Sequence, residues 1–387
     1  MNSDRIETTE IDSRDQFIDW KMLGRIILKA SILFIAINLI FAACRPLNSL
    51  GGVSLYNHLF PGRLRLPYGE VPAKDFNLTL NNLPALLASH EWGKSSSDEE
   101  YKVLLIGDSG TWGWFLRNDQ SLAGQLNAMG LRTKEGRPVI VYNLGFPFMS
   151  LTKDLMLLDQ ALLIDKPDLI LWPMTMQSFA PKRQLDHPLL QENADLVREL
   201  IQRYGLSLDS DDPRFVDRTF FEETVVGRRR ELADLLRLQT WGVAWAATGK
   251  DQDIPEDIPL RKTDLDADES WLDIKEPRQL STDDLMFDVL AAGIERAGDV
   301  PIAIVNEPIF ISDGENSHIR YNTFYPRWAF DNFRQLLSDE SQRSDWQYID
   351  LWDAIPPAEF TDTPVHLTPE GTAMMADILA GEFGWGQ

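Results

Sequence analysis

One serine follows directly on a short apolar run in the first third of the chain. The stretch is VLLIGDSGTWGWF, residues 103–115, in which Ser109 comes two residues after Gly107. A serine hydroxyl becomes a good nucleophile only when an imidazole accepts its proton, and that imidazole needs a carboxylate to fix its tautomer. Ser109 is therefore a candidate nucleophile. The competing interpretation is a strand-end turn, in which Gly, Asp and Ser are all common.

Two widespread serine-hydrolase patterns do not fit this stretch. GDSG surrounds the nucleophile of trypsin-like proteases, which also need an upstream histidine as the base. Only His58 and His90 precede Ser109, and neither stands in the small-residue and cysteine setting of those proteases. The elbow G-x-S-x-G of α/β-hydrolases is absent as well, because Thr111 stands where its second glycine would be.

The elements around Ser109 alternate between strand-like and helix-like patterns. Short apolar runs typical of buried parallel strands lie at 101–107, 137–145, 167–174, 300–308 and 346–353, and helical spacing at 120–131, 150–165, 285–298, 327–339 and 369–383. This alternation predicts an α/β fold, a doubly wound parallel sheet of about five strands. The interruption at about 182–285 predicts a mostly helical insertion. Ligands of such sheets bind beyond the carboxyl ends of the strands, which is where Ser109 lies.

Three motifs together resemble the SGNH (GDSL-type) hydrolase family. They are VLLIGDSGTWG, then VYNLGFPFMS after the second predicted strand, and FTDTPVHLTPEG before the last helix. The resemblance covers roughly residues 101–181 and 300–387, and it implies an SGNH/flavodoxin-like sheet. It also implies roles for four residues by position. Ser109 is the nucleophile, His366 the base and Asp362 the orienting acid, while the N–H groups of Ser109 and Gly145 bind the oxyanion.

The chain departs from the family pattern at two places. The family spaces its acid and base as Asp-x-x-His, whereas Asp362 and His366 have one more residue between them, so Asp353 is an alternative acid. The third family block carries an Asn after the third strand, but LWPMTMQSF has none. Thr175 or Gln177 would then supply the third oxyanion donor.

An apolar segment precedes all of these motifs. Residues 26–45 include IILKASILFIAINLIFAAC, which is long enough to span a bilayer if Lys29 reaches the interface. Lys21, Arg25 and Lys29 lie on its N-terminal side, so the positive-inside rule predicts a cytoplasmic tail at 1–25 and a signal anchor. The alternatives are a cleaved signal peptide and a buried core helix. We further expect a stalk and lead-in at 46–100, and the SGNH-like domain at 101–387 outside the cytoplasm.

Composition limits the partners. The net charge of −23 leaves nothing to neutralise phosphates, so nucleic acid is not expected as a partner. The single cysteine, Cys44, rules out an internal disulfide and a cysteine-based zinc site. No cofactor and no metal are implied.

The sequence therefore predicts a membrane-anchored SGNH-type enzyme that carries out ester chemistry through an acyl-enzyme. By resemblance, an acylated cell-surface carbohydrate or a small ester is the expected substrate, and a membrane acyltransferase is a possible partner. Esterase and O-acyltransferase remain open, because they differ only in whether water or a hydroxyl attacks the acyl-enzyme. The alternative is a non-catalytic SGNH-like scaffold or carbohydrate-binding partner of a membrane acyltransferase complex. The two differ in whether Ser109 lies within hydrogen-bond reach of His366.

Overall fold

A computed structural model describes residues 20–60, 62–69, 80–94, 97 and 99–387. The chain divides into two compact units. The first holds the N-terminal helix α1 (Trp20–Cys44) and the segment Arg218–Arg229, and the second holds Leu47–Asp217 with Arg230–Gln387. Most of the predicted cytoplasmic tail lies outside the described residues.

The larger unit is built on one parallel sheet. Its strands are β1 (Tyr101–Leu105), β2 (Val139–Asn143), β3 (Leu169–Met174), β4 (Ile302–Asn306) and β5 (Gln347–Asp350). They lie in the order β2-β1-β3-β4-β5, with all neighbours parallel. This is the doubly wound order with its switch point between β1 and β3. The predicted α/β class and five-stranded sheet are confirmed.

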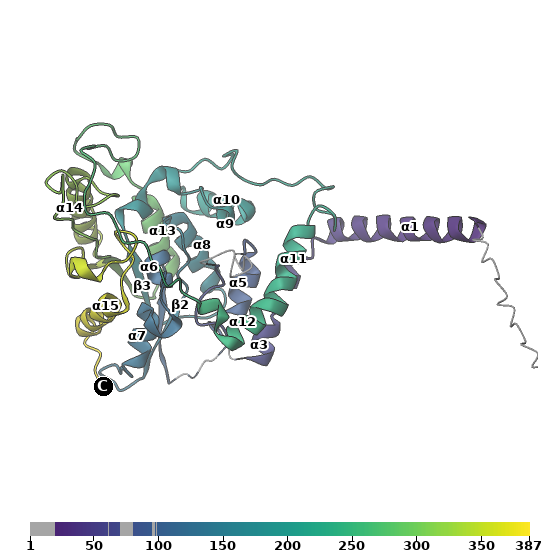
Figure 1. The fold of residues 1–387 in the computed structure, drawn as a ribbon, viewed down its shortest axis with the longest axis horizontal. Helices are drawn as coiled ribbons and strands as arrows, with labels where there is room; N and C mark the ends of the chain where they lie inside the picture. Colours follow the sequence, from purple (N-terminus) through teal and green to yellow (C-terminus); the bar gives the residue numbers. More distant parts are fainter. Residues whose placement is uncertain (1–19, 61, 70–79, 95–96, 98) are drawn as a thin grey trace, which may run out of the picture. The chain divides into compact units, whose positions relative to one another are not determined.

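Side-chain alternation along the strands separates two buried layers. Val103 and Leu105 of β1 belong to the cluster that helices α7 (Leu122–Ala128) and α15 (Pro369–Glu382) complete. Trp172 of β3 points to the opposite face, where Gly293 of α13 (Phe287–Ala297) lies against its ring. Helix α8 (Leu151–Ala161) packs beside α13 on that face (Figure 1). Helix α14 (Arg327–Arg343) contacts the edge strand β5.

The residues before β1 form short helices that pack on this unit. They are α2 (Leu47–Gly51), α3 (Leu55–Leu59) and α5 (Leu83–Ser89). Leu66 and Trp92 are buried, and Arg65 donates to the carbonyls of Gly113 and Leu116 beside the Ser109 turn. The described part of 46–100 is therefore no extended stalk, because its apolar residues are needed to cover the sheet unit.

The α-helices of the insertion lie in its first two thirds, on either side of an irregular stretch at 205–228. Its helices are α9 (Pro188–Glu192), α10 (Ala194–Tyr204), α11 (Arg229–Arg237), a π-helical turn (Leu238–Gly242) and α12 (Val243–Thr248). From Gly249 to α13 the chain is mostly irregular, with 3₁₀ turns at Lys250–Gln252 and Thr282–Asp284. Arg261 in this stretch donates to the carbonyl of Phe360, so the irregular part packs against the loop before α15.

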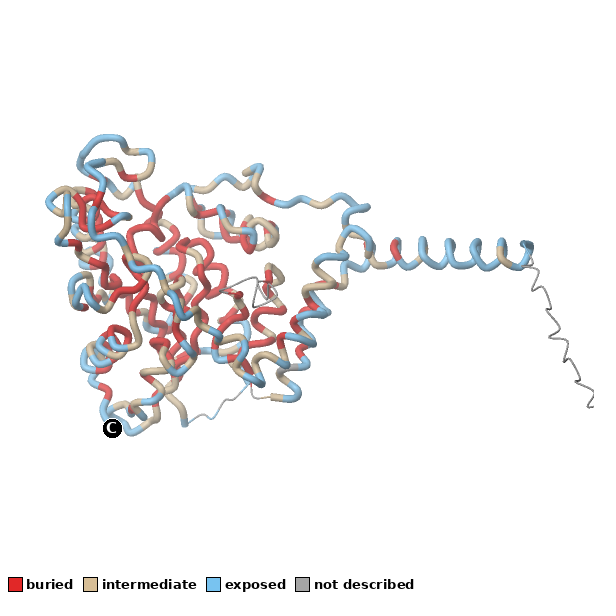
Figure 2. Tube along the Cα trace, viewed as in Figure 1, coloured by how far each residue is buried: buried red, intermediate tan, exposed pale blue. Residues whose placement is uncertain are grey.

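Helix α1 is the one helix of the described residues that is long and apolar enough to cross a membrane. Its side chains are exposed along almost the whole length (Figure 2). Asn38 and Ala42 are the exceptions and are buried within the smaller unit. A core helix would be mostly buried, so the exposure of α1 favours a lipid-facing helix over a core helix.

Candidate active site

Ser109 begins a one-turn helix at the carboxyl end of β1, next to the switch point of the sheet. This helix is α6 (Ser109–Trp112), and its N-cap Asp108 accepts a hydrogen bond of 2.8 Å from the N–H of Gly110. The turn ends at Gly113, whose φ of +94° would bring a Cβ to 2.9 Å from that of Ser121. Ser109 is half-buried, and its N–H has no acceptor among the described residues.

A histidine and an aspartate from the last loop meet Ser109. His366 Nε2 lies 2.7 Å from Ser109 Oγ, and His366 Nδ1 lies 2.8 Å from Asp362 Oδ1. The Nδ1 proton donates to the carboxylate, so Nε2 is left to accept the serine proton. The structure thus brings together the three residues predicted for catalysis. Asp353, the alternative acid, is exposed and makes no such contact.

The extra residue between Asp362 and His366 is accommodated by a hairpin. Phe360 and Leu367 pair as an antiparallel bridge, and the N–H of Thr361 donates to the carbonyl of His366 at 2.8 Å. Across this hairpin, His366 Nδ1 and Asp362 Oδ1 meet at 2.8 Å. His366 is held further by Trp114, whose ring stacks on the imidazole at 5.8 Å between centroids and 23° between planes.

The expected role of Gly145 as an oxyanion donor is not supported. Its N–H donates to Asn143 Oδ1 at 2.9 Å, so this donor is already engaged. A Cβ on Gly145 would lie 2.6 Å from the backbone nitrogen of Trp112, which explains the glycine as a close-approach residue. Asn143 also donates from Nδ2 to the carbonyl of Thr111 at 3.0 Å, so it ties the β2 loop to α6.

The two other candidate donors follow β3, the strand beside β1. Thr175 is fully buried, and its Oγ1 donates to Met149 Sδ at 4.0 Å. Gln177 is also buried, but its Oε1 has no hydrogen-bond partner among the described residues. An amide whose oxygen has no partner can turn to present its nitrogen. Gln177 is therefore the better side-chain candidate, and together with the Ser109 N–H it stays a prediction.

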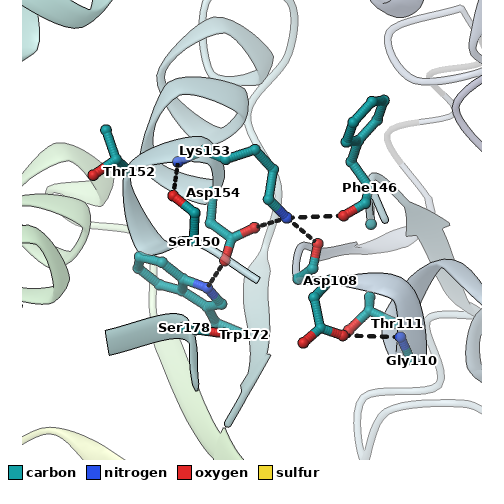
Figure 3. A network of polar contacts seen from close by, with 12 residues as sticks. Asp108, Gly110, Thr111, Phe146, Ser150, Thr152, Lys153, Asp154, Trp172 and Ser178 are labelled. Carbon is teal, nitrogen blue, oxygen red and sulfur yellow. Dashed lines mark hydrogen bonds and ion pairs between the residues drawn. The ribbon is translucent and has the colours of Figure 1, made fainter. Parts of the chain in front are cut away.

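A buried lysine fastens the nucleophile loop to the β2 loop. Lys153 of α8 is completely buried and donates from Nζ to the carbonyls of Gly107 at 2.6 Å and Phe146 at 3.1 Å (Figure 3). Asp154 lies 2.5 Å from the same ammonium and accepts from Trp172 Nε1 at 3.2 Å. Burial raises the pKa of Asp154 to about 6, although Lys153 opposes the rise. Lys153 thus holds the backbone on both sides of the candidate oxyanion position.

A second buried carboxyl lies behind α6. Thr111 Oγ1 donates to Glu307 Oε1 at 3.3 Å, and Glu307 is 5% exposed. Burial raises the pKa of Glu307 well above its ordinary value, and the nearby Asp108 carboxylate adds to the rise. Among the described residues there is no group of three or more His, Cys, Asp or Glu side chains that could hold a metal ion.

Two residues of this site, Trp114 and Lys153, were not singled out from the sequence as parts of it. Trp114 stands in the same motif as Ser109, five residues after it, and this nearness is the one signal that could have pointed to it. Lys153 gave no signal, because charged residues in helices are usually exposed. Its burial follows only from the fold.

The fold and the site together define the class of protein: a doubly wound α/β unit with a Ser-His-Asp arrangement at its switch point. No family model and no curated protein matches the chain.

Similar solved structures include a lipolytic G-D-S-L family member from Veillonella parvula, with 13% identity over 73% of this chain and 96% of that one, at a TM-score of 0.35. A catalytic mutant of an acetylxylan esterase from Geobacillus stearothermophilus has 11% identity over 74% of this chain and 95% of that one, at a TM-score of 0.36. A carbohydrate acetylesterase from Sinorhizobium meliloti has 10% identity over 74% of this chain and 99% of that one, at a TM-score of 0.34. Because these values are low, the function is inferred from the site itself.

Proposed function

We propose that this chain is a membrane-anchored serine esterase that works through an acyl-enzyme on Ser109. The observation that carries the proposal is the continuous hydrogen-bonded series Ser109–His366–Asp362, with links of 2.7 and 2.8 Å. Each member has the partner that its role needs, and Ser109 is only half-buried.

The series performs acyl transfer in two halves. Ser109 Oγ attacks the ester carbonyl while its proton passes to His366 Nε2, and the negative charge of Asp362 stabilises the imidazolium that forms. His366 then gives this proton to the leaving alcohol, and the acyl group stays on Ser109. In the second half a water or a sugar hydroxyl loses its proton to His366 and attacks the acyl-enzyme. His366 then returns a proton to Ser109 Oγ as the bond between this oxygen and the acyl group breaks, which releases an acid or a new ester.

The developing oxyanion needs donors fixed in advance. The Ser109 N–H is available for this purpose, and the amide of Gln177 is the proposed second donor. Lys153 contributes indirectly, because it fixes the carbonyls of Gly107 and Phe146 and so the direction of the peptide planes next to them.

An acylated carbohydrate is the proposed substrate. Trp114 is half-buried beside the catalytic imidazole, and Phe115 is half-buried beside Trp114, so parts of both rings are open to a bound molecule. Flat aromatic surfaces next to a triad suit the C–H faces of a sugar ring or an apolar acyl chain. We place this activity outside the cytoplasm, because Lys21, Arg25 and Lys29 precede the apolar part of α1.

The triad geometry favours an enzyme over the scaffold alternative. A scaffold has no need for a Ser–His hydrogen bond of 2.7 Å or for a carboxylate on the far nitrogen of the same ring. The partnership with a membrane acyltransferase is compatible with both and remains a proposal.

Hydrolysis of p-nitrophenyl acetate by the full chain in detergent tests the proposal. We expect turnover that is lost in Ser109→Ala and kept in Ser344→Ala, a matched change at an exposed serine. Turnover that survives Ser109→Ala would refute the role of Ser109. A folded wild-type chain without turnover on this ester and on acetylated oligosaccharides would favour the scaffold.

A further inference from the structure

Exposed apolar side chains are found in two parts of the larger unit. One part is residues 47–59, directly after α1, and the other is residues 230–242, directly after the segment Arg218–Arg229. Six of them are considered together as the juxtamembrane apolar surface: Leu50, Val53, Leu55, Leu59, Leu236 and Trp241, each between 46% and 67% exposed. Soluble domains rarely leave such a group open to water.

These two parts lie side by side within the larger unit. The N–H of Leu55 in α3 donates to Gln239 Oε1 in the π-helical turn at 2.6 Å. Arg63, a few residues after α3, donates to the carbonyl of Gly242 at 2.7 Å. Figure 1 shows α3 beside α11 and α12.

Chain length places α2 close to the end of α1. Helix α1 ends at Cys44 and α2 begins at Leu47, so two residues, Arg45 and Pro46, connect them. The three Cα-to-Cα steps from Cys44 to Leu47 span at most about 11 Å. If α1 crosses the membrane, the start of α2 therefore lies within about 11 Å of the point where α1 ends, and α3 begins eight residues after the start of α2.

A second connection brings the start of α11 to the same level. Within the smaller unit, the N–H of Val226 donates to Asn38 Oδ1 at 3.2 Å. Asn38 precedes the end of α1 by six residues, about 9 Å along the helix axis. The segment Arg218–Arg229 thus reaches the apolar part of α1, and α11 begins where this segment ends. Phe221 in the segment is 78% exposed.

The charge of this region differs from that of the rest of the chain. Residues 218–231 hold four arginines and three glutamates, and Arg45 adjoins the end of α1, whereas the whole chain carries −23. Arginines and a tryptophan at the end of a spanning helix suit the headgroup region of a bilayer.

We propose that the juxtamembrane apolar surface rests on the lipid bilayer that α1 crosses, so that the catalytic unit is seated on the membrane rather than held away from it. The occupant of the surface is lipid with anionic headgroups. The inference rests on the anchor role of α1 and is independent of the esterase activity.

Single-cysteine labelling of the full chain tests this seating. Cys44 is the only cysteine, so Cys44→Ser gives a clean background. An environment-sensitive fluorophore is placed by Leu59→Cys and Leu236→Cys, which are test sites, and by Leu260→Cys, a leucine of similar exposure elsewhere in the insertion. Ile35→Cys in α1 reports insertion itself. The chains are reconstituted in phosphatidylcholine and phosphatidylglycerol vesicles, with quencher carried either on the lipid or as aqueous iodide.

We expect the probes at 59 and 236 to be quenched several-fold more strongly by the lipid quencher than the probe at 260, and less by iodide. If the probes at 59 and 236 behave as the probe at 260 does, while the probe at 35 is quenched by the lipid quencher, α1 is a membrane anchor but the catalytic unit does not rest on the bilayer. If the probe at 35 is also exposed to water, α1 is not a membrane anchor, and the proposal that rests on it is wrong as well. Shielding of the probes at 59 and 236 from iodide in vesicles without quenching by the lipid quencher would mean that protein covers them, which also overturns the proposal.

Discussion

Replacing Lys153 by methionine probes the buried network most directly. Met has nearly the same length but no charge, so Lys153→Met leaves the Asp154 carboxylate without its ammonium and the carbonyls of Gly107 and Phe146 without a donor. Removing one partner of a buried pair typically costs about 3–5 kcal/mol. For a unit of this size we expect Tm to fall by roughly 2 °C per kcal/mol, or about 6–10 °C.

The cost must depend on pH in a particular direction. Lys153 lowers the pKa of Asp154 against the effect of burial, which leaves it at about 6. Without Lys153 the pKa of Asp154 rises further. At pH 5 the Asp154 carboxyl of the variant is therefore neutral, whereas at pH 8 the folded variant must either bury an unpaired carboxylate or take up a proton. The loss in Tm is therefore larger at pH 8 than at pH 5. In the double variant Lys153→Met with Asp154→Asn, which keeps an acceptor for Trp172, part of the loss at pH 8 is recovered.

Thermal unfolding followed by near-UV circular dichroism in detergent measures these shifts. Lys182→Met is the matched control, because Lys182 pairs with Asp273 at the surface, where an ion pair contributes at most about 1 kcal/mol. A drop in Tm for Lys153→Met no larger than for the control, or the same drop at pH 5 and pH 8, would contradict the reasoning.

Three further predictions follow from single contacts. Asp362→Asn is expected to lower kcat roughly 10⁴-fold with folding intact, whereas Asp353→Asn leaves kcat unchanged; equal losses would refute the assignment of the acid. Gln177→Leu is expected to lower kcat about 10²–10³-fold with little change in KM, and an unchanged kcat would exclude Gln177 as an oxyanion donor. Burial lowers the pKa of His90 to about 4, so the free energy of unfolding falls by about 3 kcal/mol as the pH falls from 6.5 to 4. His90→Asn should flatten this decline when the free energy of unfolding is measured by urea titration at each pH. An unaltered dependence of that free energy on pH would show that His90 is not its source.

The sheet could be predicted from sequence because each strand is an apolar run between turn residues. Burial on both faces gives parallel strands this pattern, and the runs at Val103 and Ile304 show it plainly. The pairing of Ser109 with His366 could be expected too, since the order of the motifs places both at the carboxyl edge of the sheet.

Contacts that depend on tertiary approach could not be predicted in this way. The N–H of Gly145 is taken by a side chain two residues earlier, which no spacing rule reveals. Lys153 and Asp154 stand in a helix that reads as half-exposed, yet both are buried because the two loops close over them. The lead-in before β1 has no regular period, but its residues Leu66 and Trp92 are buried against the unit.

The central claim is that His366 activates Ser109 as a nucleophile that can be acylated. Peptide mass spectrometry after treatment of the full chain with a fluorophosphonate tests it most directly. The account predicts one adduct, on the peptide that contains Ser109, which disappears in His366→Gln while the variant stays folded. A folded wild-type chain that carries no adduct, or labelling of Ser109 that persists in His366→Gln, would contradict it.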